Sequence, residues 1–134
     1  MVARTGTLVP AHCTSLGKAL LAQMTDQQVA ELYPVSAEPF AARTERSITT
    51  QARLIKEVSR VRAHGYAVNA GETEDDVGSV AVAFRDFAGR HAAIAVAAPT
   101  SRLSTSRISH IGDLMIQTIA RTPEAPVTAQ EPAE

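Results

Sequence analysis

Two stretches of alternating residues, 77–84 and 91–98, are separated by six residues that favour a turn, and this pattern constrains the fold most. Alternation with a period of two places successive side chains on opposite faces of a strand. The intervening residues 85–90 contain Asp and Gly, which predicts an antiparallel hairpin. A two-stranded ribbon is not stable alone in water, so helices or further strands must cover it.

The two faces of this hairpin differ in side-chain size. One face carries bulky residues, which we expect to pack against Leu54, Ile55 and Val58 and against the last predicted helix. These residues are Val80, Val82, Phe84, Ile94 and Val96. The opposite face carries only small residues: Ser79, Ala81, Ala83, Ala93, Ala95 and Ala97. Small side chains leave space above a sheet, so this second face predicts either a closely packed backbone segment or a ligand pocket.

Helix caps and helical periodicity surround the hairpin in the sequence. Helices are predicted over 15–24, 26–33, 51–64 and from Ser104 or Ser106 to about Arg121. Weaker alternation predicts strands over 4–9 and 66–69, and residues 34–49 read as a surface connection. The order β, α, α, α, β, β, β, α predicts an α+β fold, in which helices pack on an antiparallel sheet.

Composition excludes several classes of protein. A length of 134 residues fits one domain, and the single cysteine excludes a disulfide scaffold. Thirteen basic residues face 14 acidic ones, so the positive surplus needed for nucleic-acid binding is missing. No apolar run approaches the roughly 18 residues of a membrane span, and we expect a cytoplasmic protein. Residues 122–134 are rich in Pro, Ala and Glu, which predicts a flexible tail after a domain over 1–121.

The start of the first helix is a candidate anion site. The first N–H groups of a helix have no partner within it, so those of Ser15, Leu16 and Gly17 would hold a carboxylate. A plain N-cap by Thr14 is the alternative reading. Lys18 follows on the same helix, and we expect its side chain to point to solvent.

Cys13 lies beside His12 near this helix start, which raises the alternative of a cysteine-dependent enzyme. Neighbours in sequence point apart and no acid stands out that would orient His12, so we expect a buried, inert thiol and no catalytic residue. The four histidines lack metal-binding spacing, and the acidic run 72–76 lacks the pattern of a calcium loop. We therefore expect a solvated loop at 72–76, and no metal or other cofactor.

Four fragments carry a family likeness: HCTSLGKALLA at 12–22, IT at 48–49, RAHGYAVN at 62–69 and PTSRL at 99–103. In their order and spacing they resemble the effector-binding domain of IclR-type transcriptional regulators, and the resemblance covers about residues 6–121. It implies a GAF-like fold that binds a small metabolite, forms a homodimer or tetramer, and reaches DNA only through an N-terminal winged helix-turn-helix. We do not expect that module in this chain.

The resemblance also implies a set of ligand-binding residues. The effector carboxylate would meet the N–H groups of Ser15 and Leu16, and Asn69 and Ser79 would orient it. Asn69 stands where the family usually has Asp, and Ser79 where Cys is frequent. Alanines replace two serines common on the last strand, which favours an apolar or aromatic body in the ligand. The predicted site comprises Ser15, Leu16, Gly17, Asn69, Val77, Ser79, Ala95 and Ala97.

Together these features predict a sensor of a small organic acid that makes and breaks no bond. The alternatives are a small enzyme that uses Cys13 and His12, and a pure oligomerisation module whose alanine face is filled by helix packing. The sensor prediction assumes an enclosed space over the small-residue face of the hairpin, with the first helix opening into it.

Overall fold

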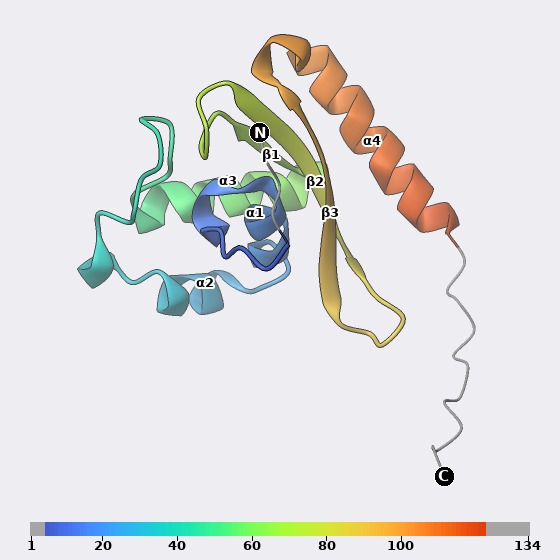
Figure 1. The fold of residues 1–134 in the computed structure, drawn as a ribbon. Helices are drawn as coiled ribbons and strands as arrows, with labels where there is room; N and C mark the ends of the chain where they lie inside the picture. Colours follow the sequence, from blue (N-terminus) through green and yellow to red (C-terminus); the bar gives the residue numbers. More distant parts are fainter. Residues whose placement is uncertain (1–4, 123–134) are drawn as a thin grey trace.

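A computed structural model describes residues 5–122 and confirms the α+β architecture (Figure 1). Four α-helices and three strands are joined by short 3₁₀ turns, labelled η. Along the chain the elements are η1 (Ala11–Cys13), α1 (Ser15–Leu21), α2 (Asp26–Leu32), η2 (Val35–Ala37), α3 (Gln51–His64), β1 (Ala67–Ala70), β2 (Val77–Arg85), β3 (His91–Pro99), η3 (Thr100–Arg102) and α4 (Thr105–Arg121).

The three strands form one antiparallel sheet in the order β1, β2, β3. Its register places Asn69 opposite Ser79, and Ser79 opposite Ala97. The predicted hairpin between β2 and β3 is confirmed. Its turn is closed by the Asp86 carboxylate, which accepts two backbone N–H groups at 2.9 Å, and by Gly89 in the left-handed region at φ +75°.

Local signals set the helix boundaries. The predicted capping box at the start of α2 is present, because the side chains of Thr25 and Gln28 each accept the other's backbone N–H. Helix α3 covers the predicted range, begins after the Thr50 cap and ends at Gly65, which has φ +83°. Helix α1 is shorter than expected and ends at Leu21.

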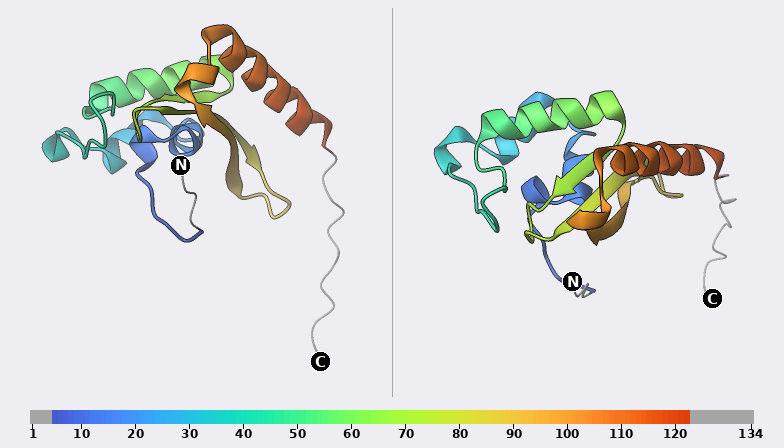
Figure 2. Two further views of the ribbon diagram at one scale, coloured as in Figure 1. Left: turned by 45° about the horizontal axis from the view of Figure 1, so that its top comes forward. Right: turned by 90° about the horizontal axis from the view of Figure 1, so that it is seen from above.

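Helices cover both faces of the sheet. Helices α1 and α3 lie on one face, and α4 lies across β2 on the other (Figure 1, Figure 2). The main core forms between α1, α2, α3 and the small-residue face of the sheet. Its buried members are Ala19, Leu21, Ala22, Val29, Ile48, Leu54, Val58, Val61, Ala67 and Ala81.

The predicted assignment of the two faces is therefore wrong in part. Leu54 and Val58 of α3 pack with Ala81 on the small-residue face, not on the bulky one. The small side chains let the helices approach the sheet closely, and this produces the dense packing that is typical of protein interiors. On the bulky face α4 packs mainly on β2, and Ile94 and Val96 of β3 remain 51% and 42% exposed.

The strand predicted over 4–9 does not form in its described part, residues 5–9, which are turn and irregular backbone. Leu8 and Val9 are 96% and 51% exposed, and a strand needs a neighbouring strand to satisfy its backbone groups. The predicted tail lies outside the described residues apart from Thr122, which ends α4. Within 5–122, none of the helices is long and apolar enough to span a membrane.

Candidate functional site

The predicted strand residues of the site lie on one face of the sheet. The register aligns Asn69, Ser79 and Ala97 in one row across the three strands. Ala81 and Ala95 belong to the next row, and residues two apart on a strand share a face. Helix α1 begins above the first row, where the Ser15 and Ser79 hydroxyl oxygens are hydrogen-bonded at 2.6 Å. The structure thus brings Ser15, Ser79 and the Asn69 row together.

The residue before α1 determines which N–H groups of its first turn are free to bind a ligand. The Thr14 hydroxyl accepts the Gly17 N–H at 3.1 Å, so the N-cap reading is confirmed and that amide already has a partner. This removes Gly17 from the predicted carboxylate contacts. Ser15 and Leu16 come before it in the first turn, where N–H groups have no carbonyl partner within the helix.

Asn69 holds the turn after β1 in place. Its Oδ1 accepts the Glu72 N–H at 2.8 Å, and its Nδ2 donates to the Thr73 hydroxyl at 3.1 Å. That hydroxyl donates in turn to the Cys13 carbonyl at 2.7 Å, which ties the turn to the segment before α1. Asn69 is therefore a structural link as well as a candidate ligand contact, with one of its two amide protons left over.

The candidate site is an open shelf rather than an enclosed void. Ser15 and Ser79 are buried, with 2% and 8% exposure, and α1 fills the space above β2. Leu16 is 37% exposed, while Ala95 is half-buried and Ala97 is exposed. The predicted enclosed space over the alanine face is thus wrong for the described residues. Close packing of α1 covers β2 and part of β3, and the face is accessible to a ligand at Ala97.

Lys18 does not point to solvent, as the sequence had suggested, but is 1% exposed. Its ammonium donates to Glu72 at 2.8 Å, to Glu57 at 3.3 Å and to the Val68 carbonyl. Glu72, placed by prediction in a solvated loop, is 8% exposed. An ammonium can be buried in this way because two carboxylates and a carbonyl replace its water shell.

One sequence signal could have revealed the burial of Lys18. Ser15, Ala19 and Ala22 are buried and follow the i, i+4, i+7 spacing of a helix face, and Lys18 occupies the i+3 position of the same face. A lysine inside an otherwise small and buried stripe indicates an internal carboxylate partner. Its partners could not be identified from spacing, since Glu57 and Glu72 are 39 and 54 residues away.

The geometry of Cys13 disfavours a catalytic role. The thiol is 0% exposed, and burial, reinforced by the negative charge of Glu72, raises its pKa. The neighbouring His12 ring uses Nε2 for a 2.7 Å hydrogen bond with the Ala41 carbonyl. The thiol is therefore held in its protonated form at neutral pH, with its neighbouring imidazole engaged elsewhere.

We expect Cys13 to react slowly with iodoacetamide at pH 7 in the native protein, and rapidly after unfolding in urea, because alkylation requires an accessible thiolate. Mass spectrometry of quenched time points measures both rates. Native labelling as fast as that of the unfolded chain would contradict the buried, protonated thiol.

The raised pKa of Cys13 also affects stability, because ionisation of the thiol favours the unfolded chain. The stability that comes from keeping the thiol protonated is present below about pH 9 and is lost above it.

No group of three or more His, Cys, Asp or Glu side chains that could hold a metal ion occurs in the described part of the chain. The chemistry available at the shelf is thus hydrogen bonding by two hydroxyls, an amide and first-turn N–H groups, beside an alanine surface. Such a surface can bind a small anion with an apolar portion.

The chain is similar to known bacterial regulators. A family model described as "Bacterial transcriptional regulator IclR C-terminal" matches residues 1–124. The chain is 33% identical over 114 residues to the HTH-type transcriptional regulator BhcR of Paracoccus denitrificans, covering 84% of this chain and 40% of that protein. It is 34% identical over 104 residues to the Pca regulon regulatory protein of Pseudomonas putida, covering 77% and 35%.

Among solved structures, the repressor BlcR of Agobacterium tumefaciens superposes with a TM-score of 0.79 at 28% sequence identity. That match covers 88% of this chain and 48% of BlcR. The chain therefore spans less than half the length of each of these three relatives. The similarity concerns one part of longer regulators.

Proposed function

This chain belongs to the IclR family of bacterial transcriptional regulators, as their C-terminal domain, and we propose that it senses a small organic acid with an apolar or aromatic body. The ligand would lie on the shelf formed by the start of α1 and the row Asn69, Ser79 and Ala97. The observation that carries this proposal is the hydrogen-bonded pair of Ser15 and Ser79 beside the exposed Ala97 of β3.

The polar end of the shelf suits a carboxylate. The Ser15 and Ser79 hydroxyls satisfy each other at 2.6 Å, yet a hydroxyl also has further acceptor and donor capacity. The N–H groups of Ser15 and Leu16 stand at the positive end of α1. A carboxylate placed there would receive hydrogen bonds from the helix start and from Ser79. Val77 lies on the same strand face as Ser79 and would flank it.

The rest of the shelf favours an apolar ligand body. Ala95 and Ala97 offer no hydrogen-bond partner, so a second polar group on the ligand would lose its water there at a cost of about 1–3 kcal/mol. A ring or alkyl chain would instead gain by covering the alanines and Leu16. This selectivity separates aromatic acids from very small polar acids.

The proposed output is a shift between arrangements of subunits. IclR-family regulators bind effectors, oligomerise and bind DNA. We propose that this domain works as a homodimer or tetramer in the bacterial cytoplasm. A ligand that prefers one arrangement would change DNA binding by another part of the protein. The size of that change is limited by the ligand's difference in affinity between the two arrangements.

A thermal-shift screen of benzoate-type and 2-keto acids, followed by calorimetry, tests the proposal. We expect Ser79→Leu to weaken the best acid by at least tenfold, about 1.4 kcal/mol, because the larger side chain occupies the carboxylate position. Ala97→Leu, at an exposed position of the same row, provides a second variant that leaves the core untouched.

Ser59→Leu is the matched control, because Ser59 is exposed on α3, outside the shelf. It should leave affinity unchanged. Equal affinity of the wild type, Ser79→Leu and Ala97→Leu would exclude the shelf as the binding site. Failure of every acid in the panel to bind would exclude the proposed ligand class.

A further inference from the structure

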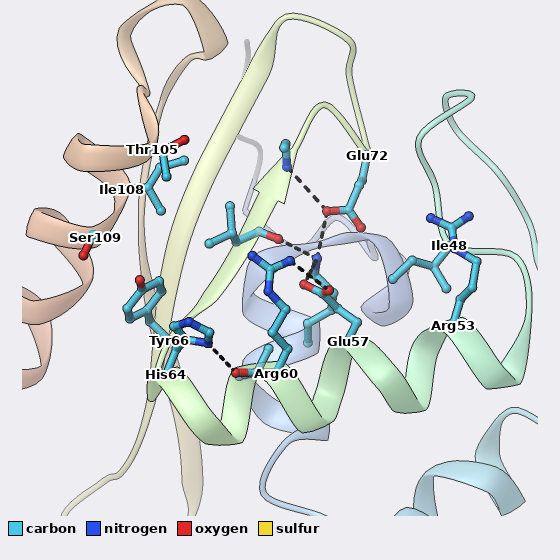
Figure 3. A pocket seen from close by; sticks show the side chains of 14 residues that line it. Ile48, Arg53, Glu57, Arg60, His64, Tyr66, Glu72, Thr105, Ile108 and Ser109 are labelled. Atoms are coloured by element: carbon cyan, nitrogen blue, oxygen red, sulfur yellow. Dashed lines mark hydrogen bonds and ion pairs between the residues drawn. The ribbon is translucent and has the colours of Figure 1, made fainter.

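A pocket lies at the free edge of β1, between α3 and α4, apart from the shelf (Figure 3). Its volume is about 530 Å³, which is within the range of small-molecule sites. Figure 3 shows Glu57 and Glu72 directed toward each other in its middle, with Arg53 on one side and residues of α4 on the opposite side. None of the predicted ligand-binding residues lines it.

The interior of this pocket has an excess of negative charge. One ammonium, that of Lys18, faces two carboxylates, those of Glu57 and Glu72. All three side chains are mostly buried, with exposures of 1%, 20% and 10%. Arg60 lies 3.7 Å from Glu57, but it is 66% exposed, and water therefore screens its contribution. A buried carboxylate without full compensation favours the approach of a further cation.

One buried oxygen in the pocket lacks a partner. Glu72 Oε2 receives Lys18 at 2.8 Å and the Ala70 N–H at 3.4 Å, whereas Oε1 has no hydrogen bond to any residue between 5 and 122. Lys18 cannot supply one, because its three protons already go to Glu57, Glu72 and the Val68 carbonyl. Buried polar atoms of folded proteins are nearly always bonded, so this oxygen points to a donor brought by a ligand.

The rim of the pocket has the opposite character. Arg53, Arg60 and His64 line it from α3, and all three are exposed. The guanidinium groups of Arg53 and Arg60 suit a carboxylate. Between rim and interior, the walls include the apolar side chains of Ile48 and Ile108. The pocket therefore offers an acceptor inside, cationic donors outside and an apolar surface between them.

We propose that this pocket binds a small zwitterion, a free amino acid or a dipeptide. Its ammonium group would donate to Glu72 Oε1, and its carboxylate would meet Arg53 and Arg60. An ammonium would supply both the missing donor and the missing positive charge, which a simple organic acid cannot do. The volume leaves room for a side chain or a second residue. This site and the shelf select different ligands, since the shelf contains no carboxylate among its predicted contacts.

The test is a thermal-shift and calorimetric screen of the L-amino acids and a set of dipeptides at millimolar concentrations, using the whole chain. Each hit is compared with its analogue that lacks the amino group and with its carboxamide. We expect both analogues to bind at least tenfold more weakly. Glu72→Gln and Arg53→Ala should each weaken the hit by about tenfold or more, because each removes a charge-assisted hydrogen bond.

Arg53 is exposed, so Arg53→Ala keeps the test decisive if Glu72→Gln fails to fold. Arg121→Ala, an exposed arginine at the end of α4, is the matched control and should bind as the wild type does. Ala97→Leu, at an exposed position of the shelf, should also bind the zwitterion normally, which distinguishes this pocket from the shelf. The proposal is overturned if no amino acid or dipeptide binds, if Arg53→Ala leaves affinity unchanged, or if Ala97→Leu abolishes binding.

Discussion

Lys18→Met is expected to lower the free energy of unfolding by about 3–5 kcal/mol. The substitution keeps an unbranched side chain but removes the ammonium that lies between Glu57 and Glu72. Two buried carboxylates would then face each other without a cation, and the Val68 carbonyl would lose its donor. Urea denaturation followed by circular dichroism measures the change. Loss of this much stability is a large fraction of what a domain of this size has in total.

The chain contains a matched control for this prediction. Lys56 is its only other lysine and is exposed on α3. Lys56→Met should change stability by no more than about 0.5 kcal/mol. Glu72→Gln should restore part of the loss when combined with Lys18→Met, since it removes one of the uncompensated charges. If Lys18→Met is as mild as Lys56→Met, the buried ion cluster does not exist as described.

Gly17→Ala is expected to destabilise the domain by about 2 kcal/mol, although Ala is the better helix former. A Cβ atom at position 17 would lie 2.2 Å from the backbone Cα and O atoms of Ala11. Helix propensity favours Ala over Gly by about 1 kcal/mol, whereas overpacking against groups that cannot rotate away costs about 1–3 kcal/mol or more. Because the obstacle is backbone, the segment Ala11–Cys13 must move away from α1.

The expected sign of this change makes the measurement decisive. Ser59→Ala, at an exposed position of α3, reports helix propensity without crowding and should stabilise by a few tenths of a kcal/mol. Urea denaturation of both variants provides the comparison. A Gly17→Ala variant that is more stable than the wild type would show that η1 does not pack on α1. Weakened acid binding would accompany the destabilisation if the shelf depends on this segment.

Features specified within a few residues could be predicted from the sequence. Helix α3 has its predicted bounds because Thr50 caps it and Gly65 takes the left-handed conformation that ends it. The hairpin register follows from the alternation and from the turn at 86–90. Caps and turns depend on residues that are only a few positions apart in the chain. They can therefore be predicted without knowledge of the tertiary fold.

Features that require contacts between distant segments were predicted poorly. The strand expected over 4–9 is missing from its described part, since backbone alternation does not supply a neighbouring strand. The candidate site was found in part: Ser15 and Ser79 meet as expected, although 64 residues separate them. Strand alternation and the helix start each singled out one of these two residues, and the family resemblance indicated that both belong to one site. Neither source indicated that Lys18 is buried with Glu57 and Glu72.

By itself the sequence determined where helices begin and end, which strands form the hairpin, and which of its faces carries only small side chains, because caps, turns and alternation act locally. Only the tertiary structure decided what occupies the space above that face. Small side chains permit both a pocket and close packing; α1 packs closely over β2 and part of β3, and an open shelf remains at Ala97. The tertiary structure also determines which charges are buried at the β1 edge, because it brings Glu57 and Glu72 close to Lys18 although they are distant in the sequence.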